Sequence, residues 1–167
     1  NSPGGLAAVW AEENSRDAIF AAMQRRETFG TSGPRMTVRF FGGWGYEADL
    51  CGDAEMVAVA DAGGVPMGGD LPTRAADSGA PSFVVSALRD PGTEASRGGM
   101  LERVQVIRGW IDDAGAPHQA VYDVATADDI EGEADLDTCA PAPGGADSLC
   151  SVWTDPDCDA TRRAVYY

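Results

Sequence analysis

Lysine is absent from this sequence, and histidine occurs only once, as His118. All twelve basic residues are therefore arginines. They stand against 27 aspartates and glutamates, and the net charge at pH 7 is −15. A surface this acidic repels phosphate backbones and anionic lipid headgroups. We therefore expect no nucleic-acid partner and no attachment to an anionic membrane surface.

Long apolar segments are also missing. No run approaches the roughly 18 consecutive apolar residues that a membrane-spanning helix needs, so we expect no membrane span. The chain begins Asn1-Ser2-Pro3, with neither an initiator methionine nor the basic and apolar regions of a signal peptide. We therefore expect a piece of a longer, processed protein. Its apolar content of 44% is typical of a folded domain.

Cysteine is scarce but even in number, with Cys51, Cys139, Cys150 and Cys158. Zinc is disfavoured because no pair has C-x-x-C spacing and only His118 could assist. We expect disulfides, as in an exported protein. Three pairings are open, and the sequence does not choose among them. One of them is a local bridge between Cys139 and Cys150 across the loop APAPGGADSL.

One segment, SRDAIFAAMQRRE, which begins at Ser15, predicts a helix. Ser15 or Asn14 is suited to cap its first turn, where Asp17 complements the helix dipole. Apolar residues recur along one side at helical spacing, and two arginines fall in the last turn. The helix ends near Glu27, before the turn signal Gly-Thr-Ser-Gly-Pro.

After this turn the pattern changes to short alternating segments separated by Gly- and Pro-rich turns. This pattern predicts a mainly β fold, an antiparallel β-sandwich-like domain with one N-terminal helix. The change in composition also predicts a domain boundary, with residues 1–35 on one side and 36–167 on the other. The strand candidates are MTVRFF, SFVVSALR, LERVQVIRGWI, HQAVYDVA, LCSVW and RAVYY.

The acidic residues Asp155, Asp157 and Asp159 alternate like the start of a calcium loop. An EF-hand loop needs glycine at its sixth position and glutamate at its twelfth, but Ala160 and Tyr166 stand there. We therefore expect a turn, in which Asp157 or Asp159 caps a short helix that runs into ATRRA.

Three other polar features have ordinary interpretations. The alternating acids within residues 129–137 predict an exposed acidic loop rather than a calcium site. Glu12 and Glu13 are adjacent, so they point apart and fit a helix entry better than a pair of glycosidase acids. His118 follows Ala-Pro and is expected to be an exposed residue at the start of a strand.

Two loops contain residue types that suit ligand binding. Thr31–Arg35 offers hydroxyls, backbone N–H groups and a guanidinium, but it follows a helix C-terminus, where the dipole disfavours anions. The glycines of Gly63–Gly69 would let a ligand or another backbone approach closely. No nucleophile elbow, dinucleotide fingerprint or phosphate-binding loop is present. We therefore assign no catalytic, cofactor-binding or metal-binding residue.

Four blocks in order resemble the closing section of a bacterial family of unknown function, DUF3604. They are Gly5–Trp44, Gly64–Pro72 (GVPMGGDLP), Leu101–Asp112 (LERVQVIRGWID) and Val152–Tyr167 (VWTDPDCDATRRAVYY). The resemblance implies an exported bacterial protein, periplasmic or extracellular, whose earlier part is similar to the polymerase-and-histidinol-phosphatase (PHP) metal-dependent hydrolases.

In that picture, residues 1–35 are the last strand-and-helix unit of an α/β barrel, and 36–167 form a β-rich C-terminal domain. The partner of this chain would be the upstream domain of the same protein, which would hold the divalent metal and the small-molecule substrate. Cys158 departs from the family pattern, which has an apolar aromatic residue there. The chain also stops at Tyr166-Tyr167, where the family continues along an apolar strand, so we expect a truncated end.

Two functions follow from the sequence. The first is the C-terminal part of an exported metal-dependent hydrolase, phosphoesterase-like, with its catalytic ligands upstream. The second is a non-catalytic β-sandwich module that binds a ligand or has a structural role. With a single histidine, this chain cannot supply a multi-histidine metal cluster, so we expect it to be inactive by itself under either interpretation.

Overall fold

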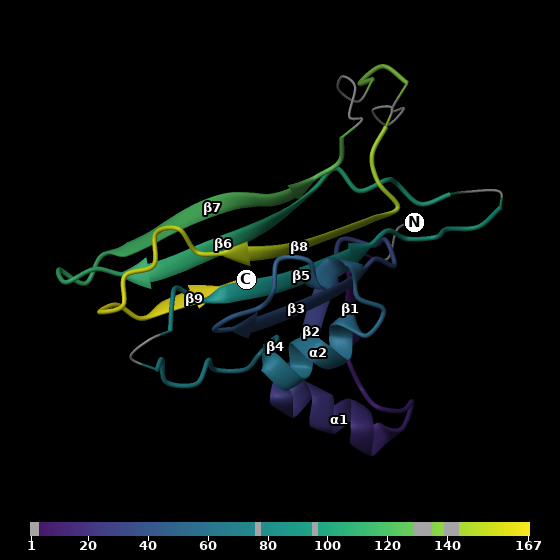
Figure 1. Cartoon of the computed structure of the whole chain (residues 1–167). Coiled ribbons are helices and arrows are strands. Elements are labelled where there is room, and N and C mark those ends of the chain that lie inside the picture. Colours follow the sequence, from purple (N-terminus) through teal and green to yellow (C-terminus); the bar gives the residue numbers. More distant parts are fainter. Residues whose placement is uncertain (1–3, 76–77, 95–96, 129–134, 139–143) are drawn as a thin grey trace.

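The computed structural model describes residues 4–75, 78–94, 97–128, 135–138 and 144–167 (Figure 1). The fold class predicted from the sequence is confirmed: the described chain is mainly β, in three antiparallel sheets with two short α-helices. In chain order the elements are β1 (Leu6–Val9), α1 (Arg16–Arg25), β2 (Thr28–Thr31), β3 (Thr37–Gly43), the 3-10 helix η1 (Leu50–Gly52), α2 (Met56–Gly63), β4 (Gly64–Pro66), β5 (Ser82–Leu88), β6 (Arg103–Ile111), β7 (Pro117–Thr126), β8 (Ser148–Thr154) and β9 (Ala164–Tyr166).

The centre of the molecule is a four-stranded sheet in the order β4-β3-β5-β8. Strand β5 pairs along its whole length with both β3 and β8. Its residues Phe83, Val84 and Val85 are buried, although successive side chains point to opposite faces. The sheet is therefore covered on both sides, which explains why three successive residues of β5, Phe83 to Val85, are apolar.

One face of this sheet packs against α2 and η1. Phe41, Val84 and Val152 lie opposite one another in neighbouring strands and so share this face. Phe41 and Val84 form a buried cluster with Leu50 of η1 and Ala60 of α2. This cluster is the apolar core on that face of the sheet, and burying Phe41, Leu50 or Val84 contributes about 1.5–3 kcal/mol each.

The opposite face carries the second large sheet, in the order β7-β6-β9. Figure 1 shows the resulting layers, with β6 and β7 on one side of the central sheet and both helices on the other. The register of β6 with β7 shifts between Val104 and Gln105. Such a bulge places two residues against one and re-aims the following side chains.

The N-terminal residues form a small separate unit in which β1 pairs with β2 and α1 connects them. The predicted cap is confirmed, because the Ser15 hydroxyl accepts a hydrogen bond from the Ala18 N–H at 3.2 Å. At the other end Arg26 takes the left-handed conformation, with φ of 63°. The N–H groups there close onto the last carbonyls of the helix, as C-caps do.

Two contacts join this unit to the central sheet. The Trp10 indole N–H donates to the Val38 carbonyl at 2.9 Å, and the Arg39 guanidinium lies 3.4 Å from the centre of the Trp10 ring.

Gly68, with φ of +86°, packs so closely on α1 that a Cβ there would lie 2.5 Å from the Arg26 carbonyl oxygen. The glycine-rich loop therefore admits another backbone. The domain boundary itself stays a prediction.

The sequence-based assignment of elements missed α2 and the strands β1, β2 and β4. The segment MVAVADAG of α2 has apolar residues on all sides and ends in glycine, so it lacks the stripe of an amphipathic helix. The short helix predicted in ATRRA is wrong, because residues 160–162 form a turn. In the part of the chain that the structure describes, no helix is long and apolar enough to cross a membrane.

Candidate functional site

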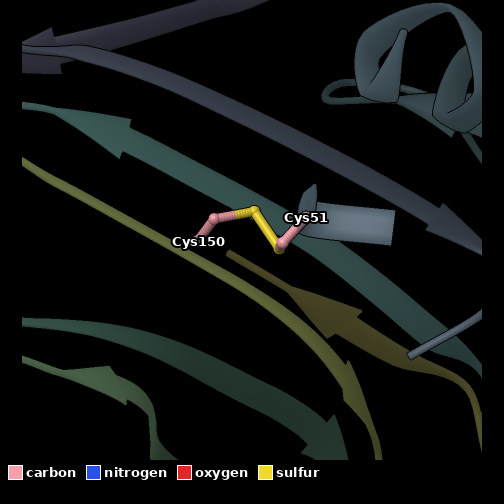
Figure 2. The surroundings of a disulfide bond; sticks show 2 residues. All are labelled: Cys51 and Cys150. Carbon is pink, nitrogen blue, oxygen red and sulfur yellow. A yellow bond between two sulfur atoms is a disulfide. The ribbon is translucent and has the colours of Figure 1, made fainter. Parts of the chain in front are cut away.

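The disulfide joins Cys51 of η1 to Cys150 of β8, 99 residues apart in the sequence (Figure 2). Their Cα atoms lie 5.8 Å apart, a normal separation for a bridge. The local Cys139–Cys150 bridge is therefore wrong, because β3, β5 and β8 bring the distant η1 to Cys150 instead. Cys139 lies outside the described residues. Cys158 has no disulfide partner within the described chain and is half-buried.

The three alternating aspartates form a turn, each with its own partner. Asp155 and Asp159 accept hydrogen bonds from the backbone N–H groups two residues further on, each at 2.9 Å. Asp157 instead accepts from the Tyr122 hydroxyl at 2.8 Å. Among the described residues, no group of three or more His, Cys, Asp or Glu side chains is placed to hold a metal ion.

Asp155 also belongs to a buried ion pair with Arg108 of β6. The Arg108 Nε lies 3.5 Å from Asp155 Oδ2, and the two side chains are only 5% and 0% exposed. Nε is nevertheless a buried atom without a hydrogen-bond partner in the described structure. Burial alone would lower the pKa of Arg108, but the Asp155 charge and a bond with Tyr122 hold it above its usual value. Arg108 is therefore charged at every physiological pH.

Two tyrosines complete this cluster, which we call the Arg108 cluster (Arg108, Tyr122, Asp155, Asp157 and Tyr166). The Tyr166 hydroxyl of β9 donates to Asp155 Oδ2 at 2.6 Å. Burial, then the bond to Asp155, raises the pKa of Tyr166 strongly, and burial and Asp157 raise that of Tyr122. Both phenols therefore remain donors, and neither acts as a base near neutral pH.

The Arg108 cluster fastens four segments to one another: β6, β7, β9 and the turn after β8. An aromatic layer lies beside it, in which the Phe83 ring is 4.3 Å from the Tyr166 ring and 5.4 Å from the Phe40 ring. The cluster therefore joins these segments through a buried charge pair and two tyrosine hydrogen bonds.

A groove opens at the end of the β7-β6-β9 sheet, and Arg108 and Tyr166 belong to its walls. His118 and Trp110 lie opposite each other on β7 and β6 and stack at 5.5 Å between ring centres. His118 is exposed near the start of β7, as predicted, and its Nε2 lies 2.7 Å from Asp112 Oδ2. That hydrogen bond, with backbone N–H donors, lowers the pKa of Asp112.

Two other features singled out from the sequence, the segment Thr31–Arg35 and the pair Glu12 and Glu13, do not line this groove. In the segment Thr31–Arg35, the Arg35 backbone N–H donates a hydrogen bond to Asp90 Oδ2 at 2.8 Å. A carboxylate of this chain therefore already binds that N–H group. This bond, followed by one from the Gly92 N–H, lowers the pKa of Asp90. Glu12 and Glu13 are exposed before α1. Residues 129–134 of the acidic segment lie outside the described chain, whereas 135–138 are exposed.

Sequence reasoning missed the Arg108 cluster, although one signal was present. Arg108 stands between Val106 and Trp110 at alternate positions of a strand, where an inward-facing apolar residue is expected. An arginine at such a position requires a buried partner, but the sequence does not identify Asp155 as that partner.

Comparison with known proteins gives one match. The model of a family described as "Protein of unknown function (DUF3604)" matches residues 1–167, the whole chain. No curated protein and no solved structure matches.

Proposed function

We propose, since the chain belongs to the DUF3604 family, that it is the non-catalytic C-terminal part of an exported bacterial metal-dependent hydrolase. In this proposal the catalytic ligands and the divalent metal belong to an upstream PHP-like domain of the same protein. The chain itself packs against that domain and contributes binding surface. The proposal includes export, which fits a disulfide that closes a loop of 99 residues.

The observation that carries the proposal is an uncovered apolar surface on α1. Phe20 and Met23 lie three residues apart on one side of this helix and are 57% and 50% exposed. Ala22, on the other side, is completely buried. A helix with apolar residues on both sides is typical of an element that lies between two packed bodies. The upstream domain would cover Phe20 and Met23.

The native protein in its source cells provides the test. Antiserum raised against this chain is used to capture the antigen from periplasmic and culture fractions. Its mass is measured on a reducing gel, its divalent metal by mass spectrometry, and its phosphoesterase activity with and without a chelator. We expect an exported antigen several times larger than 17.4 kDa, with stoichiometric metal and activity that the chelator abolishes.

The purified 167-residue chain serves as the matched control, and we expect no metal-dependent phosphoesterase activity from it. Chelator-sensitive turnover by this chain alone would contradict the proposal. A metal-free antigen of the chain's own size would instead support the second function, a binding module without chemistry. The groove beside the Arg108 cluster is the feature that favours this second function.

A further inference from the structure

A hollow lies between α2 and strand β3, on the face of the central sheet that carries the helices. Its volume is about 380 Å³. Pockets for small ligands usually have about 300–1,000 Å³. Its walls come from β3, α2, β4 and the residues just before β2 and α2. The hollow therefore has the size of a site for one small molecule.

Arg39 supplies the one positive charge among the described residues that line this hollow. Its guanidinium packs on the Trp10 ring, 3.4 Å from the ring centre. A guanidinium that packs on a ring face keeps its N–H donors, which lie in its own plane. In the described chain no hydrogen bond or ion pair joins these donors to another residue. The Trp10 contact therefore restrains the guanidinium and leaves its donors available.

Two carboxylates without ion-pair partners line the same hollow. Glu55 stands just before α2 and Asp61 in its last turns, and both are exposed and unpaired within the described chain. Glu27 is already paired with Arg25 at 2.5 Å. Burial lowers the pKa of Arg39, whereas the charges of Glu27 and Asp61 raise it. Asp61 is therefore close enough to act on Arg39, although the two form no ion pair.

The rest of the lining is apolar. It includes Val57, which is 39% exposed, and Pro66, which is half-buried. The other apolar lining residues are Phe41, Ala54 and Ala58. The hollow therefore combines an available cation, available carboxylates and an apolar surface within the space of one small molecule.

We propose that this hollow binds a zwitterionic α-amino acid with an apolar side chain. Arg39 pairs with the carboxylate, where a guanidinium can donate to both oxygens, and Asp61 pairs with the ammonium group. The net charge of −15 and Asp61 disfavour a simple anion, and Arg39 disfavours a simple cation. A ligand with both charges avoids both costs. The inference goes beyond the hydrolase proposal and does not depend on it.

The test is a calorimetric titration of the complete 167-residue chain with L-leucine and with L-methionine. Two analogues of leucine are titrated in parallel. One is 4-methylpentanoate, which lacks the ammonium group, and the other is 3-methylbutylamine, which lacks the carboxylate. We expect saturable binding of the amino acids. Each analogue should bind at least about tenfold more weakly, because it loses one charge-assisted interaction.

Two variants assign the binding to the hollow. Asp61→Asn should weaken leucine binding about tenfold and abolish the preference for leucine over 4-methylpentanoate. Arg39→Gln should do the same for the preference over 3-methylbutylamine. Asp113→Asn, at an exposed aspartate paired with Arg162 in the turn after β6, is the matched control and should leave the affinity unchanged. Circular dichroism confirms that each variant is folded. Asp61→Asn decides the question if Arg39→Gln, which loses the contact with Trp10, is not.

The proposal is overturned if the folded wild-type chain binds neither amino acid. It is also overturned if either analogue binds as tightly as leucine, which would show a site for a single charge. The same holds if folded Asp61→Asn keeps the wild-type preference for leucine, or if Asp113→Asn weakens binding as much as Asp61→Asn does.

Discussion

The two faces of the central β4-β3-β5-β8 sheet are stabilised by different kinds of interaction. On the α2 face, Phe41 and Val84 meet apolar side chains of α2 and η1, and a disulfide crosses from η1 to β8. On the other face, aromatic rings pack beside a buried ion pair with two tyrosine hydroxyls. Apolar packing is non-directional and tolerates some rearrangement, whereas a buried polar network stabilises only when every member is present. The two faces should therefore respond differently to single substitutions.

The largest effect is expected at the ion pair. Asp155→Ala leaves the buried Arg108 charge without its partner, and such a loss costs about 4 kcal/mol of unfolding free energy. Urea denaturation of the two proteins measures the difference. The exposed pair between Arg162 and Asp113 gives the control, because Asp113→Asn should change stability by less than about 1 kcal/mol.

The double variant Arg108→Met with Asp155→Leu sharpens the comparison. Replacing both charges with apolar groups removes the uncompensated charge, so the double variant should be more stable than Asp155→Ala alone. Equal losses in the two variants would mean that the cost of Asp155→Ala comes from lost packing rather than from the charge left on Arg108.

A smaller effect is expected from the covalent link on the α2 face. The chain-entropy model gives about 4.7 kcal/mol for a bridge that closes a loop of this length, and measured values are usually about 2–4 kcal/mol. We expect Cys51→Ser with Cys150→Ser to cost about 3 kcal/mol and the fold to remain, because the Phe41 cluster is intact. Thermal unfolding measures the loss. A protein that is unfolded without the bridge would show that the apolar cluster does not suffice.

The smallest effect concerns Tyr46, whose hydroxyl donates to the Ala60 carbonyl of α2 at 2.7 Å. Tyr46→Phe removes this bond and should cost about 1 kcal/mol at neutral pH. Burial, followed by the charge of Asp61, raises the pKa of Tyr46 from 10.0 to about 12. The folded chain therefore keeps this proton where the unfolded chain loses it.

This pKa shift predicts the direction in which the stability of the fold changes at alkaline pH. The contribution of Tyr46 is complete below pH 10 and is lost as the pH rises from 10 to about 12. Denaturant midpoints measured across this range should fall less steeply for Tyr46→Phe than for the wild-type protein. Parallel curves would show that the phenol is equally acidic in both states.

The sequence allowed local elements to be predicted better than contacts between distant segments. Six strand segments were recognised from their alternation, and α1 was recognised with its Ser15 cap, because these signals are local. The helix α2 was missed because its apolar residues form no stripe. The Cys51–Cys150 pairing and the Arg108–Asp155 pair were missed for a different reason. Each joins segments that only the completed sheets bring together, and local patterns carry no information about such distances.

The candidate groove illustrates the same limit. His118 was correctly expected to be exposed at a strand entry, but its stacking on Trp110 depends on the register of β6 with β7. Arg163 was expected both at the end of a short helix, ATRRA, and at the start of a strand, RAVYY; it lies just before β9, after a turn. The residue types that line the groove were therefore visible in the sequence, whereas their arrangement was not.

The disulfide also affects how the chain responds to proteases. Cys51 and Cys150 enclose more than half of the chain in one covalent ring, and exposed segments such as 135–138 lie within it. A single cut in such a segment opens the ring without releasing a fragment, so both new ends stay attached to the same molecule. Damage of this kind would be visible only after reduction, and a nicked molecule could keep both sheets and its groove in place.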